Sequence, residues 1–323
     1  MDAEQTHVAP DDLRGLPKAE LHVHLEGTVR PATLEELAAR EGISIPPFSD
    51  LTTFIDTFSA AYQTMVQPGD YRRMMREYCE DAVRSGVRYA EVQLRTAPRA
   101  YDCLAEAVDE ARRHTDITVR FVASIPRHLP LDAGWAMLDG ARGCDEVVAV
   151  SLGGIEAGYP PEPFADVFAE ARRRGLRSIP HAGEDTGPES IRGALDALRA
   201  DRIQHGIRAV EDPALVRELA DHGIPLDICP TSNVRLGVIG SYKAPPVRAL
   251  WDAGVRVSVN TDDPGFFGCT LTGEYAIAGQ LLDLDRGGYA RLARNSVEGS
   301  FAPDALKAQV HAEIDDWEWR PAR

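Results

Sequence analysis

ELHVHLEG, residues 20–27, has the composition of the last part of a buried β-strand that ends at a polar turn. It contains two histidines, His22 and His24, in positions i and i+2. Side chains two residues apart point to the same face of a strand, so both imidazoles can reach one point in space. Because imidazole is the commonest metal ligand among side chains, this stretch predicts a strand and part of a metal centre.

The overall composition limits the class of protein. The chain has 323 residues, 44% hydrophobic and 27% charged, enough for one large core or two ordinary domains. A formal net charge of −16 disfavours nucleic acid as a partner, because a negative surface repels phosphates. No apolar run approaches the roughly 18–20 residues that cross a bilayer, and Met1–Asp12 does not resemble a signal peptide. Five scattered cysteines without a CxxC pair fit reduced thiols, so we expect a cytoplasmic protein.

Eight short β-rich runs alternate with amphipathic helical segments. Several of these segments end at a glycine, as at Gly175, Gly223 and Gly254, where a left-handed C-cap forms easily. Such alternation over about 250–300 residues predicts an α/β fold, a closed (β/α)₈ TIM barrel, as a single domain over residues 1–323. An open doubly wound sheet is the alternative, but no GxGxxG motif opens the first helix. The predicted strands are Lys18–His24, Val87–Leu94, Ile117–Ile125, Glu146–Leu152, Leu176–His181, Arg202–His205, Ile224–Cys229 and Val255–Asn260.

Polar residues concentrate at the carboxyl ends of these runs, where a TIM barrel places its active site. Any one of them alone would fit a structural role, such as a hydrogen-bonded core histidine or a helix cap. Their shared position at several strand ends favours a common site. They are His22 and His24 after the first run, His181 and Glu184 after the fifth, His205 after the sixth, and Asp262 and Asp263 after the eighth.

The chemistry of this set points to a metal-assisted reaction. Three neutral histidines and one carboxylate suit zinc. A bound zinc lowers the pKa of water from 15.7 to roughly 7–9, so hydroxide is available at neutral pH. A nearby carboxylate and histidine can then transfer protons. We therefore expect attack by water on an sp² carbon.

Five motifs together resemble one family across nearly the whole chain. They are HVHLEG (22–27), HAGE (181–184), QHG (204–206), CPTSN (229–233) and NTDDP (260–264). In order and spacing they resemble the adenosine/adenine deaminases of the metal-dependent amidohydrolase superfamily. The resemblance implies a zinc-dependent aminohydrolase with a helical lid, at about residues 46–84, inserted after the first strand.

The resemblance also implies a role for each matching residue. Glu184 would protonate the purine nitrogen N1, while His205 and Asp263 would orient and deprotonate the attacking water. Gly154 matches a backbone contact to the purine. The set implied to hold the metal is His22, His24, His181 and Asp262, and the apolar lid helix would carry Phe54 and Phe58.

The substrate stays open among three 6-aminopurines. Adenosine-specific members usually carry Asp where this chain has Glu26, whereas adenine-specific members tend to carry Glu. CPTSN and NTDDP look more like the nucleoside branch. This mixture resembles bacterial relatives that deaminate aminodeoxyfutalosine, a 5′-modified adenosine of the menaquinone pathway, whose benzoate would need a partner such as Arg127 or Arg95. We expect a 6-aminopurine nucleoside to be deaminated to the 6-oxopurine with release of ammonia; an adenine deaminase is the alternative.

Other classes of function fit less well. A cytidine-deaminase type of zinc site needs PCxxC, which is missing. Binuclear relatives usually carry a carboxylated lysine where this chain has Val150-Ser151-Leu152, which favours one Zn²⁺ per chain. A non-catalytic nucleoside-binding barrel would have lost a ligand or Glu184, and all are present. The expected partner is thus a small purine nucleoside, with no nucleic acid or membrane; the sequence does not indicate the oligomeric state.

Overall fold

The computed structural model describes residues 8–95, 100–113, 115–242 and 246–320, and its strands form two parallel sheets. One sheet has the order β1-β2-β3-β4-β5 and the other the order β6-β7-β8-β9. The strands are β1 (Lys18–His24), β2 (Val87–Leu94), β3 (Thr118–Pro126), β4 (Val147–Gly153), β5 (Arg177–Ser178), β6 (His181–Ala182), β7 (Ile203–His205), β8 (Leu226–Ile228) and β9 (Val257–Val259).

The predicted fifth strand is observed as two short strands, β5 and β6. Pro180 lies between them and has no backbone N–H to donate to a neighbouring strand. The backbone still bridges the two sheets, because Ile179 N donates to Val150 O (2.9 Å) and Gln204 N donates to Pro180 O (3.0 Å). This segment therefore pairs with β4 through its first half and with β7 through its second half.

The other edges of the two sheets meet between β1 and the segment after β9. Asp262 N donates to His22 O (3.0 Å), and His24 N donates to Asp262 O (2.9 Å). Val23 and Asp262 thus form a parallel bridge. With β5 and β6 counted as one interrupted strand, the eight strands form a (β/α)₈ barrel, and the TIM-barrel prediction is confirmed.

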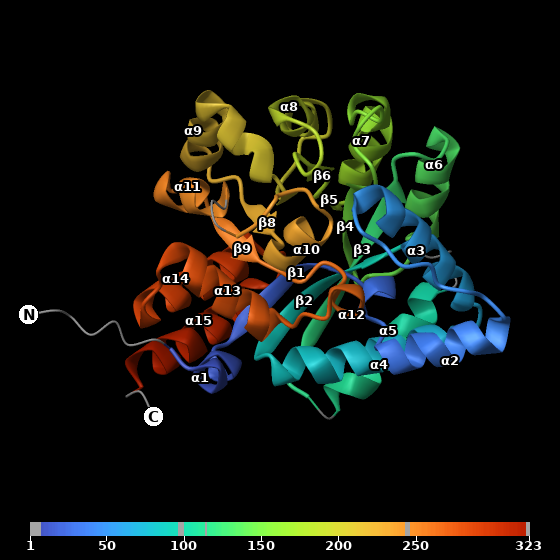
Figure 1. Cartoon of the computed structure of the whole chain (residues 1–323), viewed down its shortest axis with the longest axis horizontal. Coiled ribbons are helices and arrows are strands. Elements are labelled where there is room, and N and C mark those ends of the chain that lie inside the picture. The colour runs from blue at the N-terminus through green and yellow to red at the C-terminus, as the bar shows by residue number, and fades with distance from the viewer. Residues whose placement is uncertain (1–7, 96–99, 114, 243–245, 321–323) are drawn as a thin grey trace, which may run out of the picture.

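Helices surround the strands, and β1 lies at the centre of the view in Figure 1. No helix within the described ranges combines the length and apolar character that crossing a bilayer requires. The α-helices are α1 (Pro10–Gly15), α2 (Pro31–Glu41), α3 (Leu51–Thr64), α4 (Pro68–Arg84), α5 (Ala100–Arg112), α6 (Leu131–Gly140), α7 (Ala165–Arg173), α8 (Pro188–Ala197), α9 (Pro213–Asp221), α10 (Pro230–Arg235), α11 (Pro246–Asp252), α12 (Pro264–Phe267), α13 (Leu271–Leu282), α14 (Arg286–Gly299) and α15 (Asp304–Trp319).

Three helices, α2, α3 and α4, lie between β1 and β2 in the sequence. Helix α3 begins with a capping box, in which the Asp50 carboxylate accepts from Thr53 N and the Thr53 hydroxyl accepts from Asp50 N. Its apolar face carries Phe54 and Phe58, which pack with Leu236 and Phe267 in a small cluster separate from the main core. This position sets α3 over the carboxyl ends of the strands.

The barrel interior holds a buried ion cluster. Arg202 donates to Glu91 (2.5 Å) and to Asp227 (2.6 Å), and all three side chains are fully buried. Its remaining guanidinium nitrogen donates to Gly299 O at 2.7 Å. The two carboxylates compensate the desolvated guanidinium, so removal of Arg202 would leave two buried carboxylates without their cation.

Candidate active site

The carboxyl ends of β1, β6 and β7 and the segment after β9 bring distant side chains together. His205 and Asp262 both have a positive φ, 60° and 64°, which is uncommon for residues other than glycine. Backbone hydrogen bonds from β1 hold Asp262 on both sides, which keeps this conformation in place. Such strain is typical of residues whose side chains must point in a required direction.

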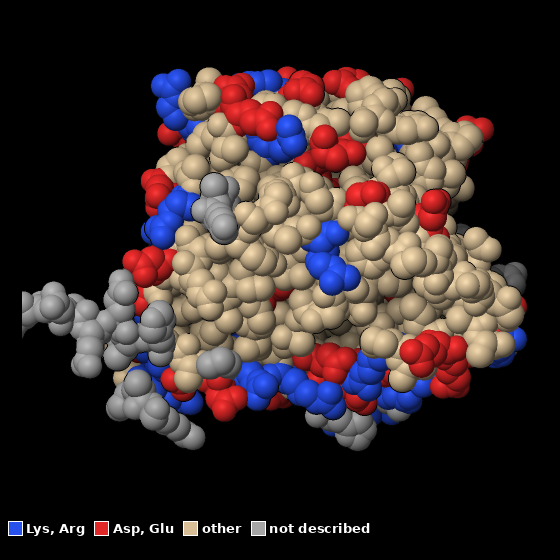
Figure 2. Space-filling view, in the orientation of Figure 1, with Lys and Arg blue, Asp and Glu red and all other residues tan. Residues whose placement is uncertain are grey.

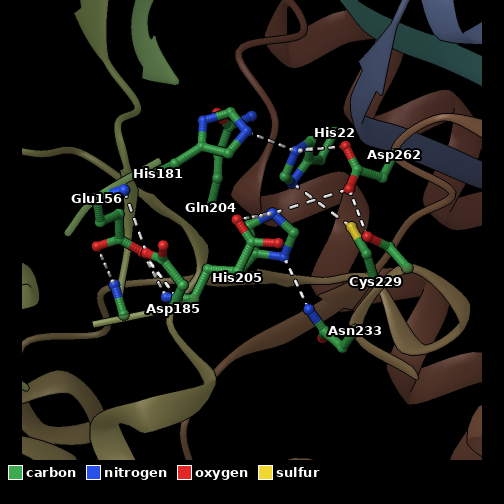
Figure 3. A network of polar contacts seen from close by, with 12 residues as sticks. His22, Glu156, His181, Asp185, Gln204, His205, Cys229, Asn233 and Asp262 are labelled. Carbon is green, nitrogen blue, oxygen red and sulfur yellow. Dashed lines mark hydrogen bonds and ion pairs between the residues drawn. The ribbon is translucent and has the colours of Figure 1, made fainter. Parts of the chain in front are cut away.

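His22, His24, His181 and Asp262 form one cluster, in which four ligand atoms all lie within 4.8 Å of one another. His22 Nε2 lies 3.1 Å from His181 Nε2, and Asp262 Oδ1 lies 3.3 Å from the Nε2 atoms of both His22 and His24. Tetrahedral zinc bonds of about 2.0–2.1 Å would separate ligand atoms by roughly 3.3 Å. The donor set and its spacing therefore fit a zinc ion; Figure 3 shows His22, His181 and Asp262 of this set.

Polar groups behind the cluster orient two of the rings. Ser151 Oγ donates to Gln204 Oε1 (2.7 Å) and lies 3.2 Å from His181 Nδ1, so Ser151 accepts the proton of that nitrogen. His22 Nδ1 faces Cys229 Sγ at 3.5 Å. Ser232 Oγ donates to Asp262 Oδ2 at 2.7 Å. Such supporting contacts fix the tautomer that leaves the Nε2 lone pairs directed at a metal.

Glu184 and His205 lie next to the cluster as a pair suited to proton transfer. Burial raises the pKa of Glu184 well above its usual value, and the negative charges of Asp262 and Glu156 raise it further. This shift favours the protonated form of Glu184, which is the form that can donate a proton. Burial lowers the pKa of His205 to about 3, so its ring is neutral. His205 Nε2 lies 3.5 Å from Glu184 Oε2, and its Nδ1 lies 3.2 Å from Asn233 Nδ2.

Asp263 is buried beside the cluster, and the described residues give its Oδ1 no hydrogen-bond partner. A Cβ atom on Gly27 would lie 1.8 Å from this oxygen, so only glycine leaves room for the carboxylate. Glu26 lies nearby, where its Oε1 accepts from Arg95 N (3.0 Å) and its Oε2 has no partner among the described residues. Burial raises the pKa of Glu26 to about 7. Each acid thus has one buried oxygen without a partner among the described residues, and of the two only Asp263 lines the pocket.

Glu156 holds the loop that carries Glu184. From its place near a strand end it could have been either a group that supports the site or a solvated acid, and the structure shows the former. Its buried carboxylate accepts from Gly183 N (2.9 Å), Glu184 N (2.7 Å) and Thr186 Oγ1 (2.9 Å), as Figure 3 shows in part. Arg127 Nη1 lies 3.6 Å from Glu156 Oε2, and Arg127 Nη2 donates to the backbone oxygen of His181 at 2.9 Å. The sequence signal was an isolated acid in the Gly-rich segment after β4.

A pocket opens onto the His/Asp cluster, and the space inside it, together with the open solvent at its mouth, is about 630 Å³. Gly154, Phe54 and Phe58, all predicted to contact substrate, line this pocket. The structure does not bring Arg127 to the pocket; its side chain is buried behind the His181 loop, and Glu26 is likewise set back from the lining. Charged residues lie mainly toward the rims of this face, and its middle is mostly uncharged (Figure 2). The other lining residues include Leu51, Ile55, Arg95, Ser124, His128 and Leu236.

A barrel with this set of metal-ligating and acid–base groups at its strand ends defines a metal-dependent hydrolase. A family model described as "Adenosine deaminase" matches residues 17–317. The chain belongs to the adenosine deaminase family, as the five motifs predicted, and it is a hydrolase that acts on C–N bonds.

Two curated relatives cover almost the whole chain. An adenine deaminase of Cupriavidus necator is 37% identical over 94% of this chain and 93% of its own length. An aminodeoxyfutalosine deaminase of Streptomyces avermitilis is 39% identical over 94% of this chain and 92% of its own length. Two relatives of nearly equal similarity therefore carry names with different substrates.

Solved structures agree with the fold. The crystal structure of an adenine deaminase from Arthrobacter aurescens has a TM-score of 0.87 and 33% identity, and it covers 93% of this chain and 98% of its own. An amidohydrolase from Burkholderia ambifaria with bound Zn has a TM-score of 0.86 and 26% identity, over 98% of this chain and 95% of its own. The family is metal-dependent, and the His/Asp cluster is the candidate metal site of this chain.

Proposed function

We propose that this protein catalyses the zinc-dependent hydrolytic deamination of a 6-aminopurine nucleoside to the 6-oxopurine, with release of ammonia. The observation that carries the proposal is the convergence of three imidazoles and Asp262 beside the buried acid Glu184, which lines the same pocket. One zinc ion per chain would be held by His22, His24, His181 and Asp262. When bound, zinc would supply a strong nucleophile from water at neutral pH.

The residues around the cluster have separate roles in this proposal. Glu184 donates its proton to the purine nitrogen N1, which makes C6 more electrophilic. His205 and Asp263 orient the attacking water and accept its proton. Water gives one proton to His205 and Asp263 and adds its oxygen to C6. That proton then passes to the exocyclic amino nitrogen, the bond between C6 and this nitrogen breaks, and ammonia leaves. The remaining hydroxyl proton returns to Glu184 as the C6 carbonyl forms. The raised pKa of Glu184 and the neutral ring of His205 support this division between acid and base.

The lining of the pocket supports a nucleoside. Phe54 and Phe58 of α3, Arg95 and His128 line it in addition to residues of the cluster, so we propose that a purine at the cluster leaves space for a substituent. We further propose that α3 is the lid over this space, and that Gly154 contacts the purine. The helical insertion is then part of one domain rather than a separate unit. Aminodeoxyfutalosine, the substrate named for one relative, is a 5′-modified nucleoside of this kind.

Adenine deaminase is the second candidate function. Glu26 occupies the position at which adenine-specific members tend to carry Glu, and a relative 37% identical to this chain is named an adenine deaminase. A free base would occupy the part of the pocket next to the cluster and leave its outer part to water.

Measurement of ammonia release from adenosine, adenine and aminodeoxyfutalosine at equal concentration tests whether a nucleoside or the free base is the preferred substrate. We expect a nucleoside to have the highest kcat/KM. If adenine exceeds both nucleosides by more than about tenfold, or ~1.4 kcal/mol of barrier, the protein is an adenine deaminase instead.

A further inference from the structure

Arg95 places a positive charge in the wall of the pocket. It follows β2 directly, and among the described pocket-lining residues it is the lone lysine or arginine. Its guanidinium carbon lies 5.9 Å from the ring centroid of Phe58 and 5.9 Å from that of Tyr62, both on α3. The described residues include no carboxylate within 4.0 Å of this guanidinium. The two buried arginines in the described part of the chain, Arg127 and Arg202, have acidic partners instead: Arg127 faces Glu156, and Arg202 pairs with two acids.

The backbone of Arg95 is fixed, and its side chain is supported by the two rings. Its N–H donates to Glu26 Oε1 at 3.0 Å. A guanidinium that stacks on aromatic faces keeps its N–H groups free at its edge. These N–H groups form a planar fork that matches the two oxygens of a carboxylate or phosphate. In a chain with a net charge of −16, an arginine that lines a pocket and has no carboxylate within 4.0 Å among the described residues is positioned for an anion.

The guanidinium lies near the proposed metal ligand His24, and the ring of Phe58 lies beside both. The Phe58 ring centroid is 6.3 Å from that of His24 and 5.9 Å from the guanidinium carbon of Arg95. His128 also lines this part of the pocket, and burial lowers its pKa, so it offers a neutral ring. Arg95 is therefore the group that can neutralise a negative charge there.

We propose that Arg95 binds an anionic group, a carboxylate or a phosphate, that the substrate carries on the side opposite its amino group. This rests on the proposed deamination of 6-aminopurine nucleosides and narrows their class to derivatives with an acidic substituent. Arg95, rather than the buried Arg127, is then the residue that selects among substrates. Adenosine itself lacks the group that Arg95 binds.

The test compares substrates that differ in charge. Wild type, Arg95→Gln and Arg95→Lys are assayed with adenosine, adenosine 5′-carboxylate, adenosine 5′-monophosphate and aminodeoxyfutalosine. We expect wild type to prefer at least one anionic compound, and the compound preferred distinguishes carboxylate from phosphate. In Arg95→Gln the ratio of kcat/KM for that compound to kcat/KM for adenosine should fall roughly 10- to 100-fold, the scale of hydrogen bonds to a charged group.

Whether KM or kcat changes in the Arg95 variants shows whether Arg95 binds the substrate or takes part in the reaction. Because Arg95 does not touch the reacting atoms, KM should rise far more than kcat falls, and Arg95→Lys should lose less than Arg95→Gln. Arg235→Gln is the matched control: Arg235 also stacks on a ring, that of Phe48 at 5.4 Å, but it is exposed and does not line the pocket. A wild-type preference for adenosine, or equal losses for neutral and anionic compounds in Arg95→Gln, would overturn the proposal.

A failure of the proposed function can be separated from a failure of this inference. If no compound releases ammonia, the deamination proposal fails, and calorimetric binding of the same compounds to wild type and Arg95→Gln still tests Arg95. Tighter binding of an anionic compound than of adenosine, lost in Arg95→Gln, supports the anion site. Equal binding to both proteins contradicts it.

Discussion

The Nε2 atoms of His22 and His181 lie 3.1 Å apart, although the two residues are separated by 159 positions in the sequence. Ser151 Oγ accepts the proton on Nδ1 of His181, because its own proton goes to Gln204. Likewise, Cys229 Sγ faces Nδ1 of His22 while its thiol proton is directed at Asp227 O (3.9 Å). Both Nε2 atoms therefore present lone pairs to the same space. Two lone pairs at this distance repel each other unless a cation lies between them, which is the physical basis of the zinc site proposed here.

Removal of the proposed acid should separate metal binding from catalysis. Glu184→Gln keeps the size of the side chain but cannot donate a carboxylic acid proton. We expect zinc content to match wild type and kcat to fall by ~10²–10⁴, the usual scale for a proton-transfer group. Steady-state kinetics with parallel metal analysis measures both. Glu189→Gln, an exposed residue five positions away, is the control, and normal turnover by Glu184→Gln would remove Glu184 from the mechanism.

Glu156 should act on the reaction through the position and the pKa of Glu184. In Glu156→Gln an amide NH₂ would face backbone donors at Gly183 and Glu184, so at least one of those hydrogen bonds is lost. Hydrogen bonds to charged groups contribute about 1.5–3 kcal/mol, so kcat should fall roughly 10- to 100-fold.

The pH profile of Glu156→Gln distinguishes positioning from a general loss of stability. The negative charge of Glu156 raises the pKa of Glu184, after burial and Asp262. Without that charge the pKa of Glu184 falls, so its active, protonated form is lost at a lower pH. The basic limb of the kcat profile should therefore move to lower pH than in wild type. An unchanged limb would mean that Glu156 acts only as a structural support.

Glu274, on α13, should make the stability of the protein depend on pH. Burial raises its pKa from 4.5 to about 7, its Oε2 accepts from Thr231 N (2.9 Å), and its Oε1 has no partner among the described residues. A carboxyl group whose pKa is higher in the folded than in the unfolded state makes its full contribution to stability below the unfolded-state pKa. That contribution is lost as the pH rises through the folded-state pKa.

Glu274→Gln removes this titration. The free energy of unfolding of the variant, minus that of wild type, should increase by about 3 kcal/mol between pH 4.5 and pH 8. Urea denaturation at several pH values measures it, with Glu35→Gln, an exposed acid on α2, as the control. A difference that stays constant across this range would show that Glu274 is ionised throughout.

The parts of the fold that follow from local pattern were predicted from the sequence. Strand β2 has the bounds Val87–Leu94 that the apolar run indicated. His22 and His24 of ELHVHLEG lie on β1, Lys18–His24, as predicted. The fifth run was predicted as one strand because its composition is apolar, yet Pro180 interrupts its pairing. The effect of Pro180 depends on which neighbouring strand would have accepted a hydrogen bond from the missing N–H. A single sequence does not specify which strand that is.

Side-chain direction was the part that the sequence could not supply. Arg127 and Arg95 each directly follow a strand, and both were candidates for the partner of the benzoate, with Arg127 predicted as the substrate-binding residue. Arg127 turns inward because Glu156, 29 positions later, offers a buried carboxylate, whereas Arg95 lies over the rings of α3. Long-range partners of this kind depend on the packing of the whole barrel. The motifs predicted which residue types are near the metal cluster but not which arginine lines the pocket.

The zinc content of the purified protein and of two ligand variants is the most direct test of the account. After dialysis against buffer, wild type should retain about one zinc per chain, and His181→Ala and Asp262→Ala should bind it at least tenfold more weakly, since even residues that only support a metal ligand contribute 10–100-fold to affinity. X-ray absorption at the zinc edge should show nitrogen and oxygen ligands near 2.0–2.1 Å. A folded wild-type protein that binds no zinc, or folded variants that bind it as tightly as wild type, would contradict the claim that these four side chains form one metal site.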